Sequence, residues 1–200
     1  SLVTKDSISI TTPFKVKIPS GEFSRLGHIG QSYQITQWFA KPAVFDKNGW
    51  HPMSYLNQGE FYSEFGDYDV SITVPKNYVL MATGDLQNKE ELDFLDQKAE
   101  ITSKLIQENK LPIRDSSGRK DMSFPNSSKE KKTLRFIQEN VHDFAWFADK
   151  RYHVLKGEVK LESKNVTSWA LFTNSEAKLW GRSIEYINDA TKYFSKWVGE

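Results

Sequence analysis

The sequence predicts a mainly β fold: an antiparallel β-sandwich or saddle-like domain followed by a short strand-helix segment. Aromatic residues make up 14% of the chain, which favours a β core because large aromatic side chains are mostly buried. Apolar and polar residues alternate along residues 68–74, as they do in a half-buried strand. A clear helical spacing of apolar residues is found near the C-terminal end.

The first strands are predicted on either side of a turn. Residues 14–18 alternate apolar and charged side chains and are followed by Pro19, which predicts a half-buried strand. Residues 30–39 carry several β-favouring side chains and predict a second β region. Pro42 and the polar cluster at residues 46–49 then predict a loop.

Two neighbouring strands are predicted in the middle of the chain. The alternating run at residues 68–74 is followed by a turn and then by an apolar run at residues 78–81. Residues 88–110 are charged, and their apolar side chains lie only roughly on one helical stripe. This segment predicts either a surface helix or a long excursion between strands.

A solvated loop and a buried strand are predicted after that. Residues 115–132 are rich in turn-forming and charged side chains, which predicts a loop with little core. Residues 133–147 return to β-forming side chains, and their centre at residues 141–147 is apolar enough to be buried. Residues 148–151 form a polar turn, where we predict a domain boundary.

The last segment is predicted to be two short strands and a helix. The strands lie around residues 159–161 and 168–172, and the helix covers about residues 174–198. Apolar or β-branched side chains recur on one helical face in steps of three and four. They are Trp180, Ile184, Ile187, Thr191, Phe194 and Val198.

Both ends of this helix carry a recognisable signal. Thr173 and Glu176 have the spacing of a capping box, in which hydroxyl and carboxylate groups satisfy free amide groups at the helix start. Gly199 is a suitable helix stop. The apolar stripe between these signals needs a packing partner.

The charge balance argues against nucleic-acid and membrane partners. The chain has 27 Lys and Arg against 26 Asp and Glu, and this net charge of +1 creates no long-range field to gather phosphates or anionic lipids. No apolar run approaches the roughly 20 residues that a membrane-spanning helix needs. Cysteine is absent, which excludes disulfides and thiolate zinc ligands.

We predict no catalytic residues and no metal site in this chain. A zinc peptidase site commonly uses two His one helical turn apart in an H-E-x-x-H motif, and His28, His51, His142 and His153 include no such pair. We expect His28 in a turn and His51 packed in a loop. His142 and Asp143 are adjacent on a predicted strand, so their side chains should point to opposite faces and form no dyad.

Four blocks of sequence resemble one family. Residues 33–52, 55–66, 82–86 and 141–148 are similar, in this order, to landmarks of the β domain in bacterial aminopeptidase N-like zinc metallopeptidases, which are gluzincins with an H-E-x-x-H site. The resemblance implies that residues 1–150 are the later part of an N-terminal β-saddle domain. Residues 151–200 would begin the thermolysin-like catalytic domain, and the longer protein would extend beyond both ends.

The resemblance also implies what this chain does. It would be a non-catalytic and inactive fragment of a zinc metallo-aminopeptidase that closes one side of the peptide-binding cleft. Its partners would be the peptide substrate and the rest of the catalytic domain. Zinc is expected in the full-length parent and no cofactor in this fragment, and family resemblance favours a periplasmic or extracellular location.

Gln37 is the candidate substrate-binding residue. Thr36 and Gln37 match a dipeptide that in this family reaches toward the free amino end of the substrate, and a Gln side chain offers both a donor and an acceptor. The alternative is that Gln37 only hydrogen-bonds loop backbone. Two positions later, where better-studied members carry Glu or Gln, this sequence has Phe39. Residues 48–52 also depart from the family pattern.

A rival hypothesis comes from another functional class. The chain could be a free-standing, aromatic-rich β-sandwich binding module that stacks carbohydrate rings or peptide side chains on Trp38, Trp50 or Trp146. The C-terminal helix distinguishes the two hypotheses. A complete module should bury the apolar stripe of that helix, whereas a fragment leaves part of it exposed or covered in a dimer.

Overall fold

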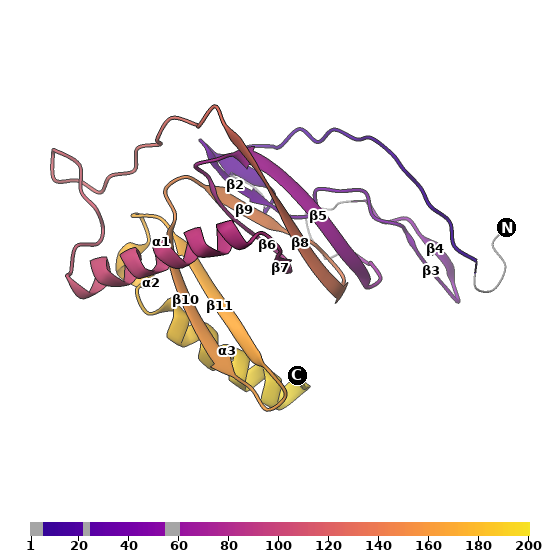
Figure 1. Cartoon of the computed structure of the whole chain (residues 1–200). Helices are drawn as coiled ribbons and strands as arrows, with labels where there is room; N and C mark the ends of the chain where they lie inside the picture. Colours follow the sequence, from indigo (N-terminus) through magenta and orange to yellow (C-terminus); the bar gives the residue numbers. More distant parts are fainter. Residues whose placement is uncertain (1–5, 22–24, 55–60) are drawn as a thin grey trace.

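Strands account for most of the regular structure in the computed structural model, which describes residues 6–21, 25–54 and 61–200 (Figure 1). The elements are β1 (Gly27–Ile29), β2 (Ser32–Ile35), β3 (Val44–Asp46), β4 (Gly49–His51), β5 (Gly66–Pro75), β6 (Val79–Ala82), β7 (Asp85–Leu86), α1 (Lys89–Gln107), β8 (Lys131–Val141), β9 (Trp146–Asp149), β10 (His153–Lys160), β11 (Asn165–Phe172), α2 (Ala177–Trp180) and α3 (Ser183–Val198). The pairings between these strands are antiparallel. The predicted mainly β fold with a terminal strand-helix segment is confirmed.

Two sheets share the main core. One has the strand order β1-β2-β9-β6 and the other has the order β5-β8-β7. Burial of their facing side chains removes apolar surface from water and holds the sheets together. The shared buried residues are Ile72, Tyr78, Leu80, Leu134, Phe136, Phe144 and Ala148. The hairpin β3–β4 and the N-terminal segment extend away from this body (Figure 1).

The two strands predicted at residues 68–74 and 78–81 are present as β5 and β6. They are not neighbours in one sheet, because β5 pairs with β8 while β6 pairs with β9. A tight turn between them, closed by the Tyr78 N–H donating to the Pro75 carbonyl at 3.0 Å, sends the chain from one sheet to the other. Both predicted strands are therefore confirmed, and the sequence did not indicate that they belong to different sheets.

The charged segment at residues 88–110 forms the helix α1, which settles the choice between helix and excursion. Leu95 and Ala99 of α1 pack against Val79 of β6 and Val154 of β10. Near the helix start, Glu91 pairs with Lys132 of β8 at 2.6 Å. The helix therefore connects the two-sheet core to the β10–β11 hairpin.

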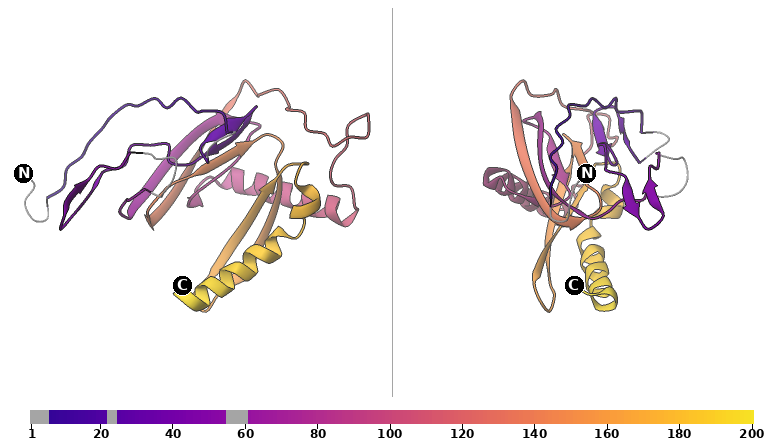
Figure 2. Two further views of the ribbon diagram at one scale, coloured as in Figure 1. Left: turned by 180° about the vertical axis from the view of Figure 1, so that it is seen from behind. Right: turned by 90° about the vertical axis from the view of Figure 1, so that its right-hand side faces the viewer.

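The C-terminal helix runs beside the β10–β11 hairpin (Figure 2). A Cβ atom at Gly157 would lie 2.4 Å from Ile184 Cγ2, so the absence of a side chain there allows the close approach of α3 to β10. Ser168 on β11 donates a hydrogen bond to Asn188 of α3 at 2.7 Å. The predicted strands around residues 159–161 and 168–172 are confirmed.

The helix predicted at residues 174–198 is divided into α2 and α3 around Gly181. Before α2, the Glu176 carboxylate accepts a hydrogen bond from the Thr173 N–H at 3.1 Å, which is the carboxylate half of the predicted capping box. The Thr173 hydroxyl accepts from the Ser175 N–H instead of from Glu176. The helix ends at Gly199 with a φ of 95°, as predicted.

Two predicted strands are corrected by the structure. Residues 14–18 form no strand and Phe14 is 55% exposed, because alternation spaces the side chains but no neighbouring described strand pairs with this backbone. Residues 141–147 are not one buried strand: β8 ends at Val141 and β9 begins at Trp146. The connection between them crosses from one sheet to the other and buries Phe144.

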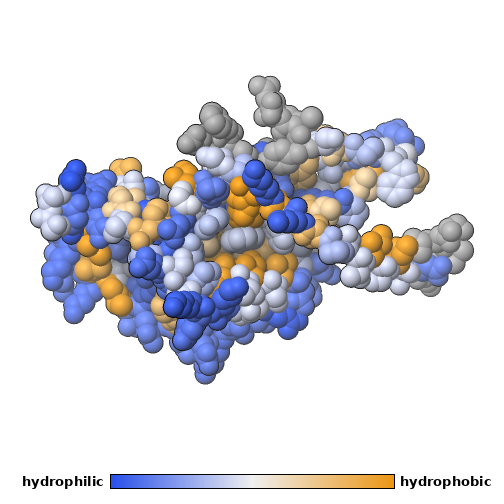
Figure 3. All heavy atoms as spheres, turned by 90° about the horizontal axis from the view of Figure 1, so that it is seen from above, coloured by the Kyte–Doolittle hydropathy of each residue, from blue (hydrophilic) through white to orange (hydrophobic). Residues whose placement is uncertain are grey.

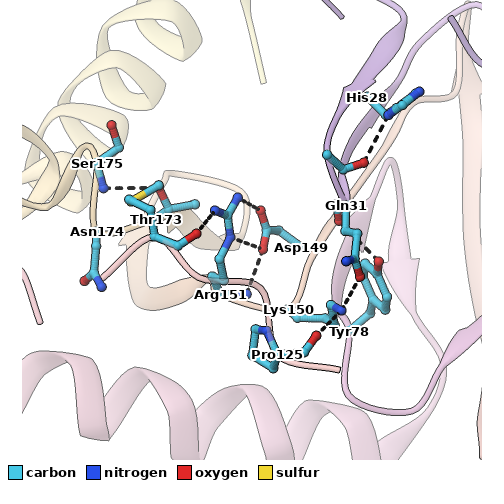
Figure 4. A network of polar contacts seen from close by, with 12 residues as sticks. His28, Gln31, Tyr78, Pro125, Asp149, Lys150, Arg151, Thr173, Asn174 and Ser175 are labelled. Atoms are coloured by element: carbon cyan, nitrogen blue, oxygen red, sulfur yellow. Dashed lines mark hydrogen bonds and ion pairs between the residues drawn. The ribbon is translucent and has the colours of Figure 1, made fainter. Parts of the chain in front are cut away.

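The polar turn at residues 148–151 is present, but it is largely buried (Figure 4). Arg151 binds both carboxylate oxygens of Asp149, at 3.0 and 2.6 Å. The Lys150 ammonium donates to the Gln31 side chain and to the Pro125 carbonyl. These bonds hold the loop before β8 against the two-sheet core. The domain boundary predicted at residues 148–151 stays a prediction.

Candidate ligand-binding site

A pocket of about 440 Å³ lies beside the segment that follows β2. The hairpin β3–β4 and the residues after position 60 supply its other walls. The segment after β2 leaves the core sheet at this point, so its backbone is not paired in that sheet. Side chains with chemical capacity in the lining are Gln37, Lys41, His51 and Tyr62, with Phe39 and Phe61 as aromatic walls.

Gln37 lines this pocket with its backbone in the left-handed region, at a φ of 50°. This conformation costs a residue with a side chain about 1–2 kcal/mol. None of the described residues hydrogen-bonds to the Gln37 side chain, so the alternative in which it binds loop backbone finds no partner there. A strained backbone with an available amide is typical of ligand-contacting residues.

Thr36 carries a second unfavourable feature beside Gln37. Its Oγ1 atom is buried and has no hydrogen-bond partner within the described part of the chain. A buried, unsatisfied hydroxyl costs about 1–3 kcal/mol, and native proteins keep few of them. The Thr36–Gln37 dipeptide therefore combines backbone strain with an unsatisfied polar group at the edge of a pocket.

Lys41 places a positive charge between aromatic rings. Its Nζ atom lies 3.6 Å from the centre of the Phe61 ring and 5.4 Å from that of Phe39. It also pairs with Asp143 Oδ1 at 2.8 Å and donates to the His142 carbonyl at 3.1 Å. The side chain is 17% exposed, so these contacts replace most of the water around the ammonium.

Asp46 and His51 form a hydrogen-bonded pair on the hairpin β3–β4. Asp46 Oδ1 lies 2.8 Å from His51 Nε2 and accepts a bond from the Asn48 N–H at the same distance. The bond from His51, followed by that from Asn48, holds the pKa of Asp46 below its ordinary value. The pair gives the pocket an oriented imidazole, which the Tyr62 ring contacts edge-on at 5.4 Å.

The sequence analysis missed this pair and placed His51 in a loop. Part of the signal was available, because Asn48-Gly49 indicates a hairpin turn, although the structure has Lys47 and Asn48 in the turn and Gly49 in β4. A hairpin turn at that point pairs Asp46 with Gly49 and Val44 with His51. The Asp46 and His51 side chains then lie diagonally across the two strands, within reach of each other.

His142 and Asp143 contact different partners, but they lie between β8 and β9 and not on the strand that was predicted. The His142 ring stacks on Phe61 at 5.9 Å with an interplanar angle of 22°. Asp143 binds Lys41 and accepts a bond from the Phe144 N–H at 2.8 Å. The two side chains therefore contact residues of the pocket lining and do not form a proton-transfer dyad with each other.

The remaining histidines are engaged separately. His28 Nδ1 lies 3.0 Å from the Gly30 carbonyl and belongs to β1, where a turn residue was expected. His153 Nε2 lies 2.8 Å from Asn174 Oδ1, and burial lowers the pKa of its imidazole. In residues 6–21, 25–54 and 61–200, no group of three His, Cys, Asp or Glu side chains could hold a metal ion. The zinc implied by the resemblance has no donor set among them, and no chemical step through it is derived.

The three tryptophans of the rival hypothesis differ in accessibility. Trp38 donates its ring N–H to the Phe144 carbonyl at 3.1 Å and packs against the core, as Trp146 also does. Trp50 is 68% exposed on β4, and its ring centre lies 5.0 Å from that of Phe45 at an interplanar angle of 57°. Of the three, Trp50 is the one with an open ring face on the projecting hairpin.

The helix α3 buries its apolar stripe only in part. Ile184 and Ile187 pack against the β10–β11 hairpin, but Phe194 and Val198 at the other end of the stripe are exposed. Trp197, on a neighbouring face, is 74% exposed. Apolar side chains also lie open to solvent on the two projecting arms of the molecule, among hydrophilic surface (Figure 3). Several large apolar side chains of α3 and of the projecting arms are therefore exposed and not packed against the rest of the chain.

Comparisons with known proteins give no family assignment: no family model, no curated protein and no solved structure matches this chain. Within the described residues, no helix combines the length and apolar character needed to cross a bilayer.

Proposed function

We propose that this chain is a non-catalytic part of a larger zinc aminopeptidase-like metallopeptidase, in which it closes one side of the peptide-binding cleft. The observation that carries the proposal is Gln37: a strained, left-handed residue with an available amide in a pocket of about 440 Å³. Its amide can donate to a peptide carbonyl and accept from a peptide N–H. The order of the family-like sequence blocks supports the same role.

The partly covered helix α3 supports a partner in the rest of the catalytic domain. Large apolar side chains that stay exposed next to polar surface are typical of protein interfaces. Along α2 and α3 these exposed side chains are Leu179, Trp180, Tyr186, Tyr193, Phe194, Trp197 and Val198. Further residues of the catalytic domain would pack against them.

Peptide binding to the purified chain tests the contact at Gln37. We expect calorimetry to detect weak binding of a short apolar dipeptide amide, and Gln37→Ala to weaken it by roughly three- to tenfold through the loss of one hydrogen-bonding group. Gln138→Ala on β8 is the matched control and should change nothing. Unaltered affinity in Gln37→Ala would contradict the proposed contact.

In the longer protein, Gln37→Ala should raise KM or lower kcat while the thermal stability is retained. The purified chain should bind no stoichiometric zinc and should release no amino acid from an aminoacyl reporter substrate. Chelator-sensitive turnover by this chain would contradict the proposal that it is a non-catalytic part of the longer protein.

A second candidate function is supported by Trp50. Its exposed ring, which contacts Phe45 at a tilted angle, can act as a platform for a carbohydrate ring or a flat peptide side chain. A binding module of this kind predicts that soluble oligosaccharides change the tryptophan fluorescence of the native chain and leave that of Trp50→Ala unchanged. A peptide that binds through Gln37 should be insensitive to Trp50→Ala.

A further inference from the structure

The charged groups around the Gln37 pocket are unusual for a site that would receive a free amino group. The described residues of its lining include no Asp and no Glu. They include one cation, Lys41, together with His51 and several apolar side chains. Among the described lining residues, an incoming ammonium group would therefore meet the like charge of Lys41, and the carboxylate paired with that charge, Asp143, is not one of these lining residues.

The contacts of Lys41 are those by which proteins recognise an ammonium ligand. Aromatic faces attract a cation through their ring quadrupoles, and a carboxylate and a carbonyl accept its N–H bonds. Lys41 obtains these interactions from Phe61, Phe39, Asp143 and the His142 carbonyl, at the distances given above. The protein thus fills a cation-binding position with its own side chain.

We propose that Lys41 is a specificity-determining residue, which occupies the cation position of this pocket and selects peptide ends without a free ammonium group. Ligands of this class are peptides with a blocked amino end or internal peptide segments. The inference rests on the proposed function, since it assumes that a peptide enters the pocket beside Gln37. It restricts the peptides that bind in this pocket to those without a free ammonium group.

Two dipeptides that differ in one charge test the selection. Phenylalanyl-alanine amide and its N-acetyl form are titrated separately into the native chain by calorimetry. We expect the acetylated peptide to bind at least about tenfold more tightly, because the free amine would meet the like charge of Lys41 in a desolvated site. Both titrations are repeated in 0.5 M NaCl. The preference for the acetylated peptide should become smaller without disappearing, because salt screens partly buried charges less than exposed ones.

Replacement of Lys41 should reverse the preference. Lys41→Met keeps most of the side-chain volume but leaves the Asp143 carboxylate and the two aromatic rings without a cation, so the free-amine peptide should become the tighter ligand. Lys41→Arg keeps the charge and should keep the native preference. The double variant Lys41→Met with Asp143→Asn removes both charges and should bind the two peptides within about twofold of each other. Lys47→Met, a change of the same type outside the pocket lining, controls for net charge.

The outcomes separate this inference from the proposed function. No binding of either peptide to the native chain would overturn the proposed peptide contact. Binding of both with equal affinity, or tighter binding of the free amine, would overturn the role of Lys41 and leave the peptide contact standing. Thermal unfolding of every variant identifies any loss of fold, and Lys41→Arg tests the inference if Lys41→Met is unfolded.

Discussion

Replacing Gln37 with glycine should stabilise the protein and weaken its ligand binding at the same time. Glycine adopts a φ of 50° without steric cost, so the substitution removes about 1–2 kcal/mol of strain. The greater freedom of glycine in the unfolded chain returns about 0.4–1 kcal/mol. The net expectation is a stabilisation of about 1 kcal/mol, or a rise in Tm of about 2–4 °C for a chain of this size.

Denaturant unfolding and peptide titration measure the two effects on the same preparation. The free energy of unfolding should increase while the affinity for the acetylated dipeptide falls roughly three- to tenfold, as expected for one lost hydrogen-bonding side chain. Asn109→Gly is the matched control, because Asn109 has a φ of 52° at the end of α1, away from the pocket lining. A destabilisation of Gln37→Gly by more than about 1 kcal/mol would show that the Gln37 side chain supports the fold, and would refute the view that its strain serves binding.

Three further predictions concern the scaffold. Gly157→Ala should destabilise the protein by about 1–3 kcal/mol in denaturant unfolding, because its Cβ would overlap Ile184, and Ile184→Ala in the same chain should recover part of the loss. Thr102→Val should cost about 1–3 kcal/mol, since it removes the acceptor of the buried Val154 N–H at 3.2 Å, while Thr102→Ser should retain most of the stability. Burial lowers the pKa of His153 in the folded state, so the unfolded chain takes up its proton first as the pH falls below about 6.5. Stability should therefore decrease between pH 6.5 and the lower folded-state pKa, and a His153→Gln variant with the same pH dependence as the native chain would contradict this.

The fold was predictable where one segment carried a complete local signal. The strand β5 and the end of α3 at Gly199 follow from alternation and from a helix stop, which depend on neighbours in the sequence. The segment at residues 14–18 has the same alternation but forms no strand, because strand formation also requires a partner edge that the sequence pattern does not identify. The assignment of β5 and β6 to different sheets was not predicted for the same reason.

Gln37 is the residue of the candidate site that was predicted from the sequence. The Thr36–Gln37 dipeptide was found through resemblance, but the left-handed backbone of Gln37 and the unsatisfied Thr36 hydroxyl are tertiary features. The contact between Lys41 and Asp143 joins residues 102 positions apart, so neither residue type nor local spacing indicates it. The Asp46–His51 pair, in contrast, could have been inferred from the hairpin register.

The pairing of β2 with β9 explains how the two parts of the site meet. Ile35, the last residue of β2, lies opposite Trp146, the first residue of β9. In an antiparallel pair, the segment that leaves one strand and the segment that enters the other emerge at the same end. The residues after Ile35 and those before Trp146 are therefore brought together, as the Trp38 bond to the Phe144 carbonyl also shows.

The geometry of Lys41 and Asp143 is consequently held by the core sheet rather than by the hairpin β3–β4, which extends away from the body (Figure 1). The hairpin contributes His51, and no other described strand or helix makes extensive contacts with it. A peptide in the pocket should then slow amide hydrogen exchange in the hairpin and leave the already protected β2 and β9 unchanged. Ordering the hairpin opposes binding through lost conformational entropy, and this cost accounts for the weak affinity expected of the chain by itself.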